Sequence, residues 1–263
     1  MERRRLITLL SDFGLKDPYV GVMKGAIANI NPQLNVIDIT HDLPPQNLIA
    51  AQFALHNAYP YFPDGTVHVA VVDPGVGSQR RAIALQLAGG YLVGPDNGIF
   101  NRIAAQSPII AAVALTNPRY WRSPDLSTTF HGRDIFAPVG AHLASGIPLD
   151  NLGDRIDPET LVSLPIPSYT KTEKHLEGTI QYIDRFGNLI TTIPGSAVTG
   201  KQWSVWLHGR EIAGGSTYHD TNLGEAIALV ASHGWVEIAV NCGNAAQELN
   251  LTWGDLVQLT TNQ

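Results

Sequence analysis

The sequence VHVAVVDPGVGS, residues 67–78, decides the fold of this chain. Its first six residues are nearly all apolar and mostly β-branched, which predicts a strand buried on both faces of a sheet. Shorter runs of the same kind predict further strands at residues 6–10, 35–39, 82–86, 91–93 and 109–115. Helices are predicted at residues 19–29, 48–58 and 136–144. This alternation favours a layered α/β domain with a mostly parallel central sheet.

The pattern changes near residues 164–176, where two prolines and several polar residues predict a linker. Glycines and asparagines then separate short strand-like runs at residues 176–183, 189–193, 203–207, 226–230, 236–240 and 256–259. Such spacing is typical of a small β-barrel or sandwich. We therefore expect two domains, an α/β domain over residues 1–168 and a smaller β domain over residues 169–263.

Composition limits the possible partners. Only 15% of the residues are charged, against a usual share of about 25%, and this suggests that part of the surface forms subunit interfaces. A net charge of -6 without a basic stripe argues against a nucleic-acid partner. The single cysteine, Cys242, cannot form an internal disulfide, and no apolar run approaches about 18 residues. We expect a cytoplasmic protein with no membrane partner.

Polar residues follow three of the predicted strands. Asp12 comes directly after the first, Asp73 after the third, and Asp96-Asn97 after a later one. Any one of them could cap a helix or shape a turn. Ligands of α/β sheets bind beyond the carboxyl ends of the strands, so three such residues at comparable places indicate a binding site.

Two other polar segments have both structural and functional interpretations. His131, in the segment FHGRD at residues 130–134, is a capping, core or site histidine. The segment DRFGN at residues 184–188 is either a hairpin turn or part of a site. His41-Asp42 stands alone, and the chain has neither HExxH nor paired cysteines, so we expect no metal site.

Six blocks follow one another in a fixed order along nearly the whole chain. They are SDFG (11–14), VDPGVGSQRR (72–81), PDNG (95–98), FHGRD (130–134), DRFGN (184–188), and SHG (232–234) through GNAA (243–246). In these blocks the chain resembles the S-adenosyl-L-methionine hydroxide adenosyltransferases, relatives of fluorinating and chlorinating adenosyltransferases. The resemblance implies an α/β domain followed by a β-barrel. It also implies a homotrimer, with each substrate held between one subunit's N-terminal domain and a neighbour's C-terminal domain.

The same resemblance implies hydrolysis of S-adenosyl-L-methionine to adenosine and L-methionine, with no cofactor. The family's water-activating Asp, Arg and His correspond to Asp73, Arg80 and His131 in this sequence. Arg81 is a rival for the arginine role because it is adjacent. The register of the motif, seven residues after the aspartate, favours Arg80.

Substrate contacts follow from the resemblance in the same way. Asp12 corresponds to the carboxylate that binds the ribose hydroxyls, and Asp184 and Asn188 to residues that hold the methionine amino-acid end. Ser232 corresponds to a contact of the methionine carboxylate, beside His233 where the halogenating relatives have arginine. The contacts implied for the rest of the substrate are adenine stacking by Tyr218, backbone groups of Val240 and Asn241 facing the adenine, and a further contact from Glu237.

Two alternatives are set against hydrolysis. A halogenating adenosyltransferase needs a small dry halide pocket in place of a charged triad. A non-catalytic sensor of S-adenosyl-L-methionine or adenosine has no use for residues that activate water. The joint presence of Asp73, Arg80 and His131 therefore favours the hydrolase.

Overall fold

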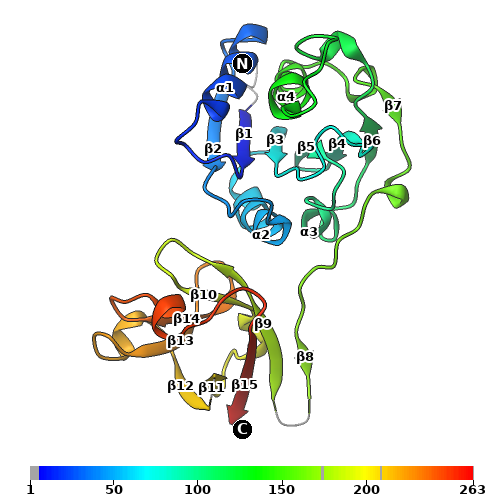
Figure 1. Cartoon of the computed structure of the whole chain (residues 1–263). Coiled ribbons are helices and arrows are strands. Elements are labelled where there is room, and N and C mark those ends of the chain that lie inside the picture. The colour runs from blue at the N-terminus through cyan, green and yellow to red at the C-terminus, as the bar shows by residue number, and fades with distance from the viewer. Residues whose placement is uncertain (1–5, 173–174, 208, 263) are drawn as a thin grey trace. The chain divides into compact units, whose positions relative to one another are not determined.

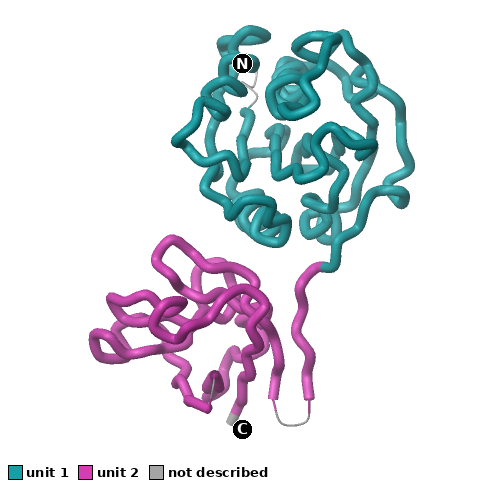
Figure 2. Tube along the Cα trace, in the orientation of Figure 1, with its two compact units in different colours: residues 1–165 teal, residues 166–263 magenta. Residues whose placement is uncertain are grey.

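The computed structural model describes residues 6–172, 175–207 and 209–262. The chain forms two compact units, Met1–Pro165 and Ile166–Gln263 (Figure 2). Each unit has its own hydrophobic core: one is built on the N-terminal sheet and its helices, and the other lies inside the C-terminal strands.

The N-terminal unit contains a seven-stranded sheet in the order β2-β1-β3-β5-β4-β6-β7. β1, β2, β3 and β5 are mutually parallel, β4 runs antiparallel to β5 and β6, and β7 runs antiparallel to β6. This confirms the predicted α/β class with a mostly parallel sheet. The strand bounds are β1 Leu6–Ser11, β2 Asn35–Thr40, β3 Thr66–Val71, β4 Ala82–Leu87, β5 Gly90–Pro95, β6 Ala111–Ala114 and β7 Asp154–Arg155.

Helices cover both faces of this sheet. Figure 1 shows α1 (Tyr19–Ile30) and α4 (Ala137–Ala144) on one side, with α2 (Leu48–Ala58) and α3 (Asn101–Ala104) on the other. Every residue of β3 is buried as a result, as the apolar run predicted. Short 3-10 helices lie in the connections at Tyr59–Tyr61, Pro118–Tyr120, Leu149–Asn151 and Pro158–Thr160.

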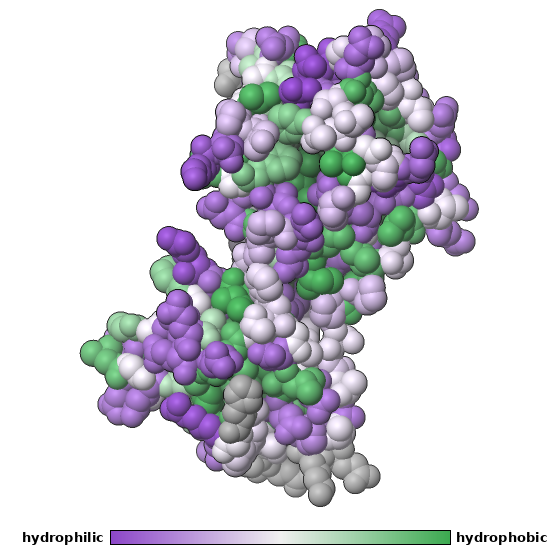
Figure 3. Space-filling model, viewed as in Figure 1, coloured by the Kyte–Doolittle hydropathy of each residue, from purple (hydrophilic) through white to green (hydrophobic). Residues whose placement is uncertain are grey.

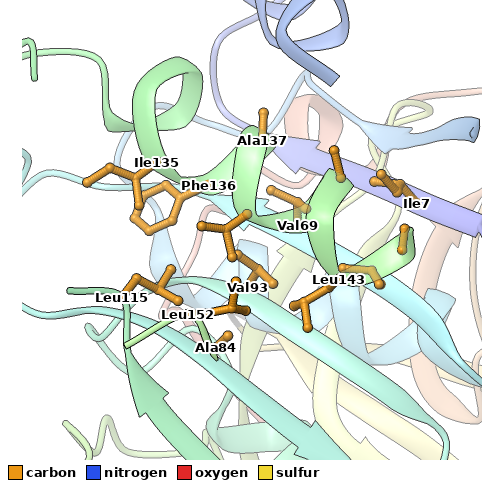
Figure 4. Packing of buried hydrophobic residues seen from close by; sticks show 14 of the residues in the cluster. Ile7, Val69, Ala84, Val93, Leu115, Ile135, Phe136, Ala137, Leu143 and Leu152 are labelled. Atoms are coloured by element: carbon orange, nitrogen blue, oxygen red, sulfur yellow. The ribbon is translucent and has the colours of Figure 1, made fainter. Parts of the chain in front are cut away.

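The α4 helix packs tightly on the middle of the sheet, where Val69, Val93 and Leu143 meet (Figure 4). A Cβ on Gly140 would come within 2.6 Å of Val69, so only glycine permits this approach. A π-helix, Gly132–Phe136, leads directly into α4. The predicted helix over 136–144 therefore missed one wide turn at its start, and such turns are frequent at functional sites.

The C-terminal unit is a closed barrel. Its strands follow the order β10-β14-β13-β12-β11-β15-β9-β8, and an additional pairing of β10 with β9 closes a ring of seven, with β8 outside it. This confirms the barrel expected for the second domain. The strand bounds are β8 Thr170–Lys171, β9 Leu176–Ile183, β10 Leu189–Pro194, β11 Gln202–Leu207, β12 Arg210–Gly215, β13 Ala226–Val230, β14 Trp235–Val240 and β15 Leu256–Asn262. Its helices are α5 (Ala245–Glu248) and 3-10 turns at Gly195–Ala197 and Tyr218–Asp220.

The surface mixes hydrophilic and hydrophobic residues in both units on the face drawn in Figure 3. Several large apolar side chains are well exposed, among them Leu15, Ile110, Phe186 and Leu223. Within the described ranges, no helix has the length and apolar character needed to cross a membrane.

Candidate active site

Two of the predicted aspartates leave the sheet at the same edge. β1 and β3 are parallel neighbours, with Ser11 opposite Val71. Asp12 follows β1 directly, and Asp73 follows β3 after Val72. The carboxyl ends of these strands therefore present both side chains at the edge where α/β sheets bind ligands.

Arg80 forms an ion pair with Asp73. Arg80 Nε donates to both carboxylate oxygens, at 2.9 and 3.1 Å, and Nη2 also donates to Oδ2. The side chains are only 10% and 5% exposed, respectively. The connecting loop turns through Gly77 at φ +78°, where a Cβ would lie 2.4 Å from the Thr128 carbonyl oxygen. Glycine at this position therefore lets the loop fold back and bring Arg80 onto Asp73.

His131 contacts the other side of the same guanidinium group. Its Nδ1 lies 2.8 Å from Arg80 Nη2. Because arginine can only donate, Nδ1 must accept, which leaves the proton of the neutral ring on Nε2. Burial and the Arg80 charge lower the pKa of His131, although Asp73 and Asp134 work in the opposite direction. The structure thus joins Asp73, Arg80 and a neutral His131 in one hydrogen-bonded chain.

Arg81, the rival arginine, points to a different partner. Its Nε donates to Asp96 Oδ2 at 2.7 Å, and its Nη1 donates to the Thr160 hydroxyl at 2.9 Å. Asp96 Oδ1 accepts from the Val162 amide at 2.9 Å. Arg81 and Asp96 thus tie down the segment after the last 3-10 helix of this unit and make no contact with the Asp73 chain.

Asp134 anchors the π-helix that follows His131. It is fully buried and accepts from Arg122 Nε at 2.7 Å, Arg133 Nε at 2.6 Å and the Ser127 amide at 2.9 Å. Burial works to raise its pKa, but the hydrogen bonds from Arg133 and Arg122 outweigh that and hold the pKa well below its usual range. Sequence reasoning included Asp134 in a motif without assigning it this role.

The Asp12 carboxylate accepts a hydrogen bond from the rest of the chain. Its Oδ2 accepts from the Gln46 amide at 2.8 Å, and Gln46 has the unusual φ of 64°. A carboxylate offers about four acceptor positions, so most of its capacity remains for a ligand. Sequence reasoning missed Gln46, since nothing in its neighbourhood marks a backbone donor.

In the barrel, Asp184 organises the turn between β9 and β10. Its Oδ1 accepts from the Phe186 and Asn188 amides at 2.9 and 2.8 Å, and its Oδ2 accepts from Asn188 Nδ2 at 3.1 Å. The hairpin interpretation of DRFGN is therefore correct as local structure. Oδ2 still has a lone pair to offer, so the same carboxylate can serve a cation.

Tyr218, Glu237 and His233 form a second network in the barrel. The Tyr218 hydroxyl donates to Glu237 Oε1 at 2.8 Å, and His233 Nε2 lies 3.2 Å from Glu237 Oε2. Burial and the Glu237 hydrogen bond raise the pKa of Tyr218 to about 12, with a smaller contribution from the Asp184 charge. Asp184 therefore lies close enough to act on this network, while the Tyr218 residue stays 41% exposed.

The other predicted barrel contacts differ in availability. Ser232 is exposed in the turn between β13 and β14. The Asn241 amide donates to the Glu225 carbonyl at 3.0 Å, and its carbonyl accepts from Gly224 at 2.8 Å. The Val240 carbonyl accepts from Gly243 at 3.0 Å. The Asn241 side-chain Nδ2 also donates, to the Thr221 carbonyl at 2.9 Å, and both residues are buried, so most of their polar atoms are used within the barrel.

Potential metal ligands do not cluster in the described residues: no group of three or more His, Cys, Asp or Glu there could hold an ion. The chemistry of the Asp73 chain is instead that of a preorganised donor. A buried guanidinium, aligned by a carboxylate and an imidazole, stabilises negative charge that develops on an oxygen.

Comparison with known proteins supplies the family. The profile of the S-adenosyl-L-methionine (SAM) hydroxide adenosyltransferase N-terminal domain matches residues 7–153, and that of the C-terminal domain matches residues 178–258. A Thermus thermophilus protein named (R)-S-adenosyl-L-methionine hydrolase is 43% identical over 97% of this chain and 99% of its own.

Two further relatives agree with this match. A crystal structure of a conserved protein from Thermotoga maritima superposes with a TM-score of 0.90 at 36% identity, over 97% of this chain and 99% of that one. A Nocardia brasiliensis protein named fluorinase is 26% identical over 98% of this chain and 97% of its own. Both domain matches and the similarity over the whole chain show that the chain belongs to the SAM hydroxide adenosyltransferase family.

Proposed function

We propose that this chain is an S-adenosyl-L-methionine hydrolase that forms adenosine and L-methionine. The observation that carries the proposal is the hydrogen-bonded chain of Asp73, Arg80 and His131 at the edge of the sheet. The substrate's sulfonium departs as a neutral thioether, so the leaving group needs no help. The nucleophile does need help, since water has a pKa of about 15.7.

The reaction is an in-line displacement at ribose C5′. A water oxygen forms the new C5′–O bond while the C5′–S electron pair moves to sulfur. Arg80 Nη1, which neither Asp73 nor His131 occupies, binds the water and stabilises its developing negative charge. As the C5′–O bond forms, the water gives up one proton to solvent, so adenosine, L-methionine and one proton are the products, while His131 Nδ1 holds Arg80 Nη2 in place. Asp73 keeps the guanidinium aligned throughout.

Binding of the substrate uses the other named residues. Asp12 accepts from the ribose hydroxyls, and Asp184 Oδ2 with the Asn188 side-chain oxygen receives the methionine ammonium. The exposed ring of Tyr218 stacks on the adenine, beside Val240 and Asn241.

The network behind Tyr218 is assigned to positioning. Glu237 is 3% exposed, and both of its oxygens are bonded to Tyr218 and His233. Glu237 therefore acts by holding the Tyr218 ring in place. Ser232 donates its hydroxyl to the methionine carboxylate.

Assembly and location form part of the same proposal. We infer a cytoplasmic homotrimer in which each substrate is shared by the N-terminal domain of one subunit and the C-terminal domain of a neighbour. The low charged fraction and exposed apolar residues beside Asp12, such as Leu15 at 67% and Tyr19 at 46%, support a subunit interface there. Light scattering that finds a fully active monomer would refute this assembly.

One incubation separates the candidate functions. Purified protein is mixed with S-adenosyl-L-methionine in ¹⁸O-labelled water with chloride or fluoride present, and products are identified by chromatography and mass spectrometry. We expect adenosine carrying the heavy oxygen at C5′. A 5′-halogenated nucleoside would instead indicate a halogenase, and tight binding without turnover would indicate a sensor.

A further inference from the structure

A buried pair of polar side chains, with an exposed ion pair beside it, lies next to the candidate site but takes no part in the proposed chemistry. Ser11 Oγ lies 2.7 Å from His41 Nδ1, and both residues are buried, at 0% and 3% exposed. His41 Nε2 lies 3.2 Å from Asp38 Oδ1, close but poorly aligned. Asp38 Oδ2 also accepts from Lys24 at 2.6 Å.

The direction of each proton in this chain follows from the chemistry of the groups. The Asp38 carboxylate can only accept, so its proximity favours the His41 tautomer that carries the proton on Nε2. His41 Nδ1 is then an acceptor, and the Ser11 hydroxyl donates to it. Ser11 Oγ in turn accepts from the Phe13 amide at 3.3 Å. Although the set resembles a nucleophilic triad, a fully buried serine cannot reach a substrate, so its effect must pass through the backbone.

That backbone is the loop that carries Asp12. Beyond the contact to Phe13, the Gly14 amide donates to the His41 carbonyl at 2.8 Å. Asp12 therefore lies between Ser11 and Gly14, which are both hydrogen-bonded to His41. On the far side, the Gln46 amide holds the Asp12 carboxylate at 2.8 Å, so residues 41–46 hold this loop at three points.

The loop also touches the segment that presents His131. The Phe13 ring lies 5.8 Å from the Phe130 ring, edge to face. A Cβ on Gly132 would be 3.5 Å from Phe13 Cε2. A shift of the loop would therefore displace both the Asp12 carboxylate and the aromatic wall beside His131.

We propose that His41, through Ser11, is a positioning residue that sets the Asp12 carboxylate for recognition of the vicinal ribose hydroxyls. The proposal rests on the proposed function, since it takes Asp12 as the ribose contact. Ser11 and His41 do not touch the substrate. Their loss weakens hydroxyl recognition because one anchored loop becomes free to take several positions.

The chain offers a matched control in the same strand. Thr8, three residues before Ser11 in β1, makes a buried hydrogen bond of 2.8 Å to His68 Nδ1. It too joins a hydroxyl of β1 to an imidazole, here on β3, but it lies further from Asp12 along β1. Thr8→Val and Ser11→Ala each remove one buried hydroxyl of this kind, so a general loss of stability affects both variants.

The experiment measures the affinities of the full-length protein for adenosine and 2′-deoxyadenosine by calorimetry. The wild type should prefer adenosine, and Asp12→Ala should abolish most of that preference. Ser11→Ala should bind adenosine about tenfold more weakly, the effect of roughly one hydrogen bond, and lose most of the preference, while Ser11→Thr restores it. Thr8→Val should keep the wild-type ratio.

The outcomes test the ribose contact of Asp12 and the positioning role of His41 and Ser11 separately. A wild type that binds no adenosine, or an Asp12→Ala variant that keeps the preference, refutes the ribose contact and with it the proposed function of Asp12. A preference that depends on Asp12 but survives in Ser11→Ala overturns the positioning role alone. If Ser11→Ala does not fold, His41→Asn, which keeps an acceptor near the Nδ1 position, is measured against His41→Leu. Equal ratios in those two variants would also overturn the role.

Discussion

Arg80→Ala removes the three contacts to Asp73 and the one to His131 in a single step. The Asp73 side chain is 5% exposed, so its charge loses its partner with little water to replace it. Breaking a buried pair from one side costs about 3–5 kcal/mol of unfolding free energy. Turnover should fall by about 100- to 1000-fold, the usual effect of losing one preorganised donor to a developing oxyanion.

Arg81→Ala is the matched control, because Arg81 also pairs with a buried aspartate. The Asp96 side chain is 3% exposed and that of Arg81 is 32% exposed, so the loss of stability should lie at or below about 3 kcal/mol. Turnover of the folded variant should stay close to wild type, since Arg81 faces Thr160 and not His131.

The assay combines urea unfolding with single-turnover kinetics at a temperature where both variants are folded. Adding Asp73→Asn to Arg80→Ala should slow the enzyme little further, because residues that act as a unit are not additive. The reasoning is refuted if folded Arg80→Ala turns over at the wild-type rate. It is equally refuted if Arg81→Ala is as slow as Arg80→Ala at equal stability.

Three other predictions test the frame around the site. Burial lowers the pKa of His68 to about 4; the unfolded chain binds this proton below about pH 6.5, so stability should fall by up to about 3 kcal/mol as the pH drops from 6.5 to 4. Urea unfolding at several pH values should show this fall, and His68→Gln should flatten it. Asp134→Asn leaves two arginines without their buried negative charge and should cost about 3 kcal/mol in the same assay; wild-type stability would contradict the anchoring role. Gly77→Ala meets the Thr128 carbonyl oxygen at φ +78°, whereas Gly200→Ala at φ +74° meets open space, so calorimetric melting should fall clearly further for the former, along with turnover.

Much of the fold follows from local pattern. The run at residues 67–72 is apolar except for His68, so it has no polar face for water and predicts a strand buried on both faces. The sheet, its helices and the barrel strands follow the same logic. The strand β12 was not predicted, because Arg210–Gly215 begins with two charged residues and ends in two glycines. A Cβ on Gly214 would lie 2.6 Å from Trp203. Its strand character comes from packing against a neighbour, which no local pattern records.

The site divides in the same way. The motif register pointed to Arg80, but neighbouring arginines have the same chemistry, and only the direction of each side chain in space separates the Asp73 partner from the Asp96 partner. His41 looked isolated because its hydrogen-bond partner Ser11 lies 30 positions earlier in the sequence, on β1. The protonation of His131 also depends on a contact across 51 positions of sequence. By itself, the sequence determined most of the strands, the α/β class of the first domain and the residue types of the site, since these depend on hydrophobic periodicity and short motifs. Periodicity left a barrel and a sandwich open for the second domain, and the family resemblance implied the barrel. Tertiary structure alone decided which donor meets which acceptor, because hydrogen bonds form between atoms that folding, and not sequence order, brings together.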